Sequence, residues 1–157
     1  MTGIRFLPLD TATVRALQRG GPDAYGFRAE RAVSDGDGMP CRHCLANIDA
    51  GEDYLILAHR PFPAEQPFAE TGPIFLHARE CEAAEAGPRL PEILTQSPRY
   101  ILRGYGRDDR ILYGSGRVVE QADITAYAEE LLAEPEIAYI HVRSATNNCY
   151  QARIERA

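Results

Sequence analysis

The stretch that most constrains the fold reads Cys41-Arg42-His43-Cys44 and places two cysteines three positions apart. This spacing lets two thiolates hold one ion from a tight turn, as tetrahedral zinc requires. Further along, His77-Ala78-Arg79-Glu80-Cys81 supplies a histidine and a cysteine four positions apart, and such a pair shares one face of a helix. We therefore expect one structural zinc site, with the ligands Cys41, Cys44, His77 and Cys81.

Other interpretations of the cysteines remain open. A thioredoxin-like redox pair would begin a long helix, but Gly51 interrupts any helix that starts at Cys44. A c-type haem motif needs histidine directly after the second cysteine, where Leu45 stands. The cysteines could also be ordinary buried side chains, and iron could replace zinc in such a sulfur-rich site. His43 is a substitute ligand candidate, although its position predicts a side chain that faces solvent.

A site with four protein ligands is closed. It stabilises a fold and offers no coordinated water for chemistry. The expected ion is therefore structural and not catalytic.

Composition and charge limit the class of protein. The chain has 157 residues, 45% hydrophobic and 25% charged, which predicts a single globular domain over residues 1–157. No apolar run reaches the roughly 20 residues of a membrane span, and residues 1–10 do not resemble a signal peptide. We therefore expect a cytoplasmic protein, in which four cysteines suggest metal binding or catalysis.

The net charge of −6 argues against a nucleic-acid partner.

Periodicity predicts an α+β fold with a mainly antiparallel sheet and two or three short helices. Segments that favour strands are residues 4–8, 24–32, 54–58, 74–76, 99–105, 110–119, 137–143 and 149–156. Helices are expected after Asp10, which can cap one that ends before Gly20, and over residues 78–86 and 124–132. Residues 106–109 form a turn-like tetrad between two of the strands.

A second group of polar residues lies near the C-terminus. Successive strand residues face opposite sides of a sheet, so if Ile140 and Val142 face the core, His141 and Arg143 share the other face. With Tyr150 assigned to the core and the strands taken as neighbours, we expect this face to carry a ligand-binding set. The set is Arg103, Tyr105, His141, Arg143, Gln151 and Arg153.

Three arginines with a histidine could bind a small anion. The alternative is a solvated face whose arginines pair with neighbouring carboxylates. An enzyme is a further alternative: His141, with Arg143 and Tyr105, would act on an anionic substrate, or Cys149 would act as a nucleophile with His141 as its base. No phosphate-binding glycine loop or serine-hydrolase motif is present.

Two resemblances follow from these segments. Residues 41–85 resemble a treble-clef zinc finger, in which a cysteine knuckle and a hairpin precede a helix that supplies the last two ligands, although a proline-rich insertion separates the hairpin strands here. The chain also resembles a bacterial family known as domain of unknown function 1203. The resemblance rests on four stretches, which are Pro40–Leu45 with Gly51-Glu52, Phe68–His77, His141–Ala145 and Asn148–Gln151. This resemblance implies a single domain and brings no activity with it.

The sequence thus predicts a non-enzymatic, zinc-stabilised protein that binds a small anionic ligand or a protein partner.

Overall fold

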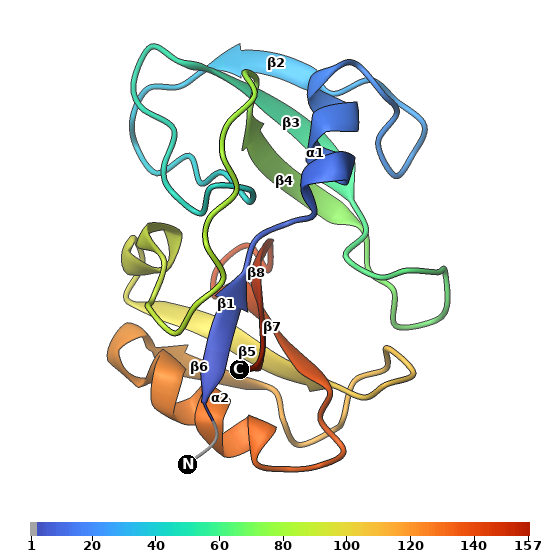
Figure 1. Cartoon of the computed structure of the whole chain (residues 1–157), viewed down its shortest axis with the longest axis vertical. Coiled ribbons are helices and arrows are strands. Elements are labelled where there is room, and N and C mark those ends of the chain that lie inside the picture. Colours follow the sequence, from blue (N-terminus) through green and yellow to red (C-terminus); the bar gives the residue numbers. More distant parts are fainter. Residues whose placement is uncertain (1–2) are drawn as a thin grey trace.

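The computed structural model describes residues 3–157 and shows an α+β protein with two antiparallel sheets (Figure 1). The five-stranded sheet has the order β1-β8-β7-β5-β6, and the three-stranded sheet has the order β2-β3-β4. The strands are β1 (Ile4–Leu7), β2 (Glu30–Val33), β3 (Asp53–His59), β4 (Gly72–His77), β5 (Arg99–Tyr105), β6 (Arg117–Glu120), β7 (Tyr139–Ser144) and β8 (Tyr150–Arg156). The helices are α1 (Thr11–Gln18), α2 (Ile124–Leu132) and the short 3-10 turns η1 (Glu92–Thr95) and η2 (Gln121–Asp123).

Helix α2 covers one face of the five-stranded sheet (Figure 1). Its apolar residues recur with helical spacing, and Ile124, Ala128 and Leu131 are buried. They belong to the same core as Ile140 and Val142 of β7. The alternation in β7 and the 3.6-residue period in α2 therefore produce a single apolar layer between sheet and helix.

The three-stranded sheet has its own core and lies beside α1 (Figure 1). Asp10 caps α1 by accepting a hydrogen bond from the backbone N–H of Thr13 at 3.0 Å, as the sequence predicted. Val14 and Leu17 from the buried face of α1 pack in the same cluster as Leu57 and Leu76.

The second face of the five-stranded sheet is covered along β7, contrary to the expectation of an accessible polar face, while Arg103 and Arg153 at its sides remain partly exposed. Phe62, in the segment between β3 and β4, packs with Tyr105 and Tyr139 from the sheet. As a result His141 is 0% exposed, and every residue from Tyr139 to Arg143 is buried.

A β-bulge changes the register between β7 and β8. Val142 pairs with Ala152, whereas Arg143 pairs with Tyr150, so Gln151 is the extra residue. Directly paired residues project to the same face, so Tyr150 lies on the face of Arg143 and not in the α2 core. Tyr150 is buried as predicted, but in the apolar cluster of the three-stranded sheet and not beside Ile154 against α2.

The helix expected over residues 78–86 is also wrong, because this segment is irregular. Its alanines and glutamates favour helix in isolation, but its carbonyl groups are used elsewhere. Arg15 of α1 donates to the Cys81 carbonyl at 2.6 Å, and Gln18 donates to the carbonyls of His77 and Arg79 at 3.0 and 2.7 Å. Hydrogen bonds to α1 thus take the place of the backbone hydrogen bonds that a helix over residues 78–86 would form.

Two predicted strands are shorter than expected. The segment at 24–32 contributes only β2, and the segment at 110–119 contributes only β6. Residues 106–116 form a longer connection between β5 and β6 than the predicted tetrad.

Candidate metal centre and buried polar face

The first two candidate ligands lie in a tight turn. Pro40 and Asn47 form an isolated bridge that closes this turn, and the backbone N–H of Leu45 donates to the carbonyl of Cys41 at 3.0 Å. Leu45 has a left-handed conformation with φ of 57°, which is rare for a bulky residue. The buried Leu45 side chain anchors the turn in the α2 core, so the turn can present Cys41 and Cys44 on one side.

The other two candidate ligands lie at the end of β4 and just after it. His77 is the last residue of β4, and its backbone N–H donates to the sulfur of Cys41 at 3.4 Å. Cys81 follows in the irregular segment, where the N–H of Ala84 donates to the carbonyl of His43 at 2.9 Å. The arrangement is consistent with a zinc-finger-like site, but its second ligand pair does not lie on the helix of a treble clef.

The structure brings the four predicted side chains together. One ligand atom from each of Cys41, Cys44, His77 and Cys81 lies within 4.8 Å of the others. The sulfur atoms of Cys41 and Cys81 are 3.9 Å apart, and the Cys44 sulfur lies 3.5 Å from His77 Nδ1. The cluster could therefore hold one metal ion.

The thiols interact strongly with one another. Hydrogen bonds from Cys44 and Cys81 hold the pKa of the Cys41 thiol well below its usual range, and the hydrogen bond to Cys41 raises the pKa of Cys44 and of Cys81. Thiols this close together share their protons, and the thiolate is the form that binds a metal. A cation that bound here would release the remaining thiol protons and share the thiolate charge among the sulfurs.

Glu52 interacts with the outer nitrogen of His77. Its carboxylate lies 3.3 Å from Nε2, while Nδ1 faces the sulfur of Cys44. A carboxylate at Nε2 keeps the proton there and leaves the Nδ1 lone pair for a metal, which is a common arrangement around metal-binding histidines. Spacing along the sequence does not indicate this contact, because Glu52 and His77 are 25 positions apart.

His43 is buried beside the cluster, so the prediction that it faces solvent was wrong. Its Nδ1 lies 3.2 Å from the sulfur of Cys81, and its Nε2 lies 2.9 Å from the hydroxyl of Thr11. With Cys81 as a thiolate, Nδ1–H donates to the sulfur and the Thr11 hydroxyl donates to Nε2. His43 therefore orients a ligand and links the cluster to the start of α1.

The predicted ligand-binding residues divide into separate groups. Arg103 and Arg143 both approach the carboxylate of Glu70, at 2.9 and 3.5 Å. Arg153 pairs with Glu155 at 2.7 Å and lies over the ring of Tyr139. Each predicted arginine therefore has a carboxylate partner, in agreement with the alternative weighed from the sequence, although Arg143 is buried and not solvated.

His141 is enclosed by aromatic rings. The ring centroids of Phe62, Tyr105, Tyr139 and Tyr150 lie between 4.8 and 5.1 Å from its own. Neither ring nitrogen has a hydrogen-bond partner among residues 3–157. Burial, with the positive charges of Arg143 and Arg153, lowers its pKa far below the usual value. His141 is therefore a neutral residue enclosed by aromatic side chains, and the alternative in which it acts in catalysis stays untested.

The bulge separates Gln151 from the predicted set. Gln151 lines a pocket that also contains Arg42 and Tyr100, whereas Arg143 lines a different pocket. Cys149 lies at the wall shared by these two pockets, and its sulfur donates to the Asn147 carbonyl at 3.7 Å. It makes no hydrogen bond with His141, so the predicted cysteine–histidine pair is not formed in the part of the chain that the structure describes.

The fold and the cluster together define an α+β protein with a buried candidate metal centre of three cysteines and one histidine. The family model described as "Protein of unknown function (DUF1203)" matches residues 38–156, and the chain belongs to this family. No curated protein and no solved structure matches the chain. Among the described residues, no helix has the length and apolar character needed to cross a membrane.

Proposed function

We propose that this protein is a non-enzymatic binding protein whose fold is stabilised by a structural zinc ion at Cys41, Cys44, His77 and Cys81. The observation that carries the proposal is the spacing of the ligand atoms. A tetrahedral ion with metal–sulfur bonds of about 2.3 Å requires sulfur atoms about 3.8 Å apart. The separation of 3.9 Å between the sulfurs of Cys41 and Cys81 fits this requirement before any ion is added.

The ligand set also supports a structural role. Four protein ligands complete a tetrahedron and leave no position for a reacting water. The contacts of His77 with Glu52 and of Cys81 with His43 add the outer hydrogen bonds that such sites use to orient their ligands. Zinc is the ion we expect, because it is the commoner occupant of closed sites with three cysteines and one histidine. Zinc binding by thiolates requires reduced cysteines, which the expected cytoplasmic location would maintain.

The proposed binding role concerns a small anionic ligand or a protein partner. It is supported by the buried Arg143 and the partly buried Arg103 on the second face of the five-stranded sheet, since arginine suits buried ion pairs and oxyanion recognition. The overall charge of −6 favours such partners over nucleic acid.

The first test is the metal content of Cys44→Ser against that of Cys149→Ser. The wild-type protein, purified without added metal or chelator, is expected to contain about one zinc per chain by elemental mass spectrometry. Cys44→Ser should lose the zinc and roughly 3–5 kcal/mol of stability, which corresponds to a fall in Tm of about 10 °C or more. Cys149→Ser removes a cysteine outside the cluster and should keep both. A wild-type protein without metal, and a Cys44→Ser variant with an unchanged Tm, would contradict the proposal.

A further inference from the structure

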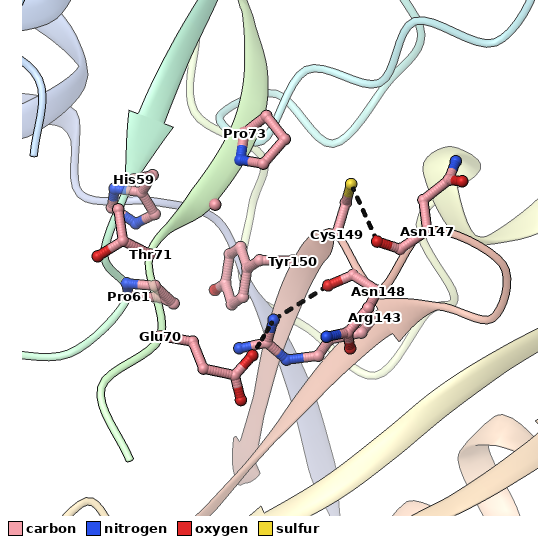
Figure 2. A pocket seen from close by; sticks show the side chains of 11 residues that line it. His59, Pro61, Glu70, Thr71, Pro73, Arg143, Asn147, Asn148, Cys149 and Tyr150 are labelled. Atoms are coloured by element: carbon pink, nitrogen blue, oxygen red, sulfur yellow. Dashed lines mark hydrogen bonds and ion pairs between the residues drawn. The ribbon is translucent and has the colours of Figure 1, made fainter. Parts of the chain in front are cut away.

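A pocket of about 210 Å³ lies between the two sheets, beside the turn that joins β7 and β8. One side is formed by His59 at the end of β3 and by residues 70–73 at the start of β4. The other side is formed by Arg143 and residues 147–150 (Figure 2). None of the four candidate metal ligands lines it, so it is separate from the metal centre.

The central group of this pocket is a buried guanidinium. The Arg143 side chain is 5% exposed and extends between Glu70 and the Asn148 backbone (Figure 2). Nη1 donates to the carbonyl of Asn148 at 3.1 Å, whereas Nε and Nη2 are buried without a hydrogen-bond partner among the described residues. A guanidinium has five N–H donors, and leaving buried donors unpaired is costly. Arg143 therefore has free capacity for an acceptor, which a ligand would reach through a small shift of the pocket wall, because neither nitrogen is exposed.

The charges around the pocket do not balance. Glu70 is the carboxylate shared by Arg103 and Arg143, so two positive charges face one negative charge. Arg42, also buried, donates to the Tyr150 carbonyl at 2.8 Å and lines the neighbouring pocket, so its charge is not part of this balance. A buried positive charge without a counter-ion is unfavourable. An anion in the pocket would compensate one of these charges.

His59 lies at the pocket wall, and nearby positive charges affect its pKa. Burial, followed by the charges of Arg42 and Arg60, lowers the pKa of His59 to about 4. Its Nε2 is buried and has no partner in the described part of the chain. A neutral His59 can donate one hydrogen bond to a ligand oxygen without adding further positive charge.

We propose that this pocket binds the carboxylate group of a small organic acid, with Arg143 and His59 as the principal contacts. The assignment rests on the proposed role as a binding protein for a small anion, and it names the ligand class and the site. Two guanidinium groups that share Glu70 leave one positive charge to balance, which matches a single carboxylate. Planar carboxylates also suit the fork of an arginine. Thr71 and Asn147 at the wall can bind the polar remainder of a ligand only a few atoms long.

The test is an NMR titration of the zinc-loaded full chain with acetate, lactate and inorganic phosphate. Acetate and lactate are expected to give saturable shifts at Thr71 and residues 147–149, with a Kd on the order of 1–10 mM for such small probes. Bound carboxylate should also raise the pKa of His59, which a general salt effect would not do selectively. Arg143→Gln is expected to weaken binding at least about tenfold.

Two further variants keep the test decisive. Asn147→Asp adds a carboxylate at an exposed position of the rim and should weaken binding several-fold without altering the core, so it decides the question if Arg143→Gln does not fold. Arg99→Gln removes an exposed arginine that pairs with Glu120 away from the pocket and should leave binding unchanged.

Several results would overturn the proposal. They are the absence of saturable shifts up to about 50 mM probe, unchanged affinity in Arg143→Gln or Asn147→Asp, and saturation by phosphate alone. Zinc content and Tm are measured on the same samples. A protein that keeps its zinc but binds no carboxylate rejects the pocket while the structural ion stands, and a protein without zinc rejects the metal proposal independently.

Discussion

At the scale of single residues, Glu52 contacts the ring nitrogen of His77 that faces away from the sulfur of Cys44. The Glu52 carboxylate is 3.3 Å from His77 Nε2 and 3.1 Å from Nε of Arg79. Arg79 lowers the pKa of Glu52, so the carboxylate remains ionised. An ionised acceptor at Nε2 favours the tautomer that leaves Nδ1 free to coordinate a metal.

We therefore expect Glu52→Gln to weaken zinc binding by about 10- to 100-fold. The amide is similar in shape but is a weaker acceptor and can also present N–H groups to Nε2. Competition with a chromophoric zinc chelator measures the change.

The matched control for this substitution is Arg79→Gln. This variant removes the ion pair with Glu52 but keeps the carboxylate against His77. It should change zinc affinity much less than Glu52→Gln. Equal losses in the two variants would assign the effect to the Arg79 pair and not to the orientation of His77.

At the scale of elements, α1 is held on the metal-binding segment by polar contacts. Arg15 and Gln18 donate to carbonyl groups of the segment that carries Cys81, and Thr11 contacts His43. These contacts depend on the path that His77 and Cys81 take when they face the other two cysteines. The metal centre and the position of α1 should therefore be coupled.

Removal of zinc by a chelator is expected to expose α1 and residues 77–87 to solvent before the five-stranded sheet. The sheet and α2 have an independent apolar core, whereas the metal-binding segment has no regular hydrogen-bond pattern of its own. Hydrogen exchange followed by mass spectrometry should show faster exchange in α1 while β5 and β7 remain protected. Loss of protection in all segments at once would show that the ion stabilises the whole molecule as one cooperative unit.

At the scale of the whole molecule, the space between the two sheets combines aromatic rings, arginines and uncharged histidines. His59 and His141 both have lowered pKa values because they are buried beside positive charges. In the unfolded chain each would take up a proton near pH 6.5. Acid should therefore favour the unfolded chain.

For His59 the pH range follows from the folded pKa of about 4 and the ordinary value of 6.5. The stability that depends on neutral His59 is present above pH 6.5 and is lost as the pH falls from 6.5 through about 4. The loss should reach up to about 3 kcal/mol. Urea unfolding between pH 7 and 4 at fixed zinc concentration measures it. In His59→Gln this part of the slope should disappear, and an identical slope in both proteins would contradict the assignment.

Local spacing in the sequence already indicated several parts of this molecule. The spacing within Cys41/Cys44 and within His77/Cys81 predicted two ligand pairs, since the residue types and short separations are typical of zinc ligands, although the helix assumed for the second pair does not form. The apolar period of residues 124–132 predicted α2, and the alternation in residues 139–143 predicted which side chains of β7 face α2. These features depend on neighbours along the chain, so the sequence was sufficient to find them.

Contacts between distant segments were not accessible in this way. The bulge opposite Arg143 changed the faces of Tyr150 and Gln151, and Phe62 covered a sheet face that alternation alone presents as open. Glu70 meets Arg143 only because β4 is brought beside the β7–β8 turn. Likewise, α1 took the carbonyl groups that a helix over residues 78–86 would have used. For residues 78–86, tertiary hydrogen bonding outweighed a helix preference of a few tenths of a kcal/mol per residue, and the other contacts join segments whose proximity only the folded chain determines.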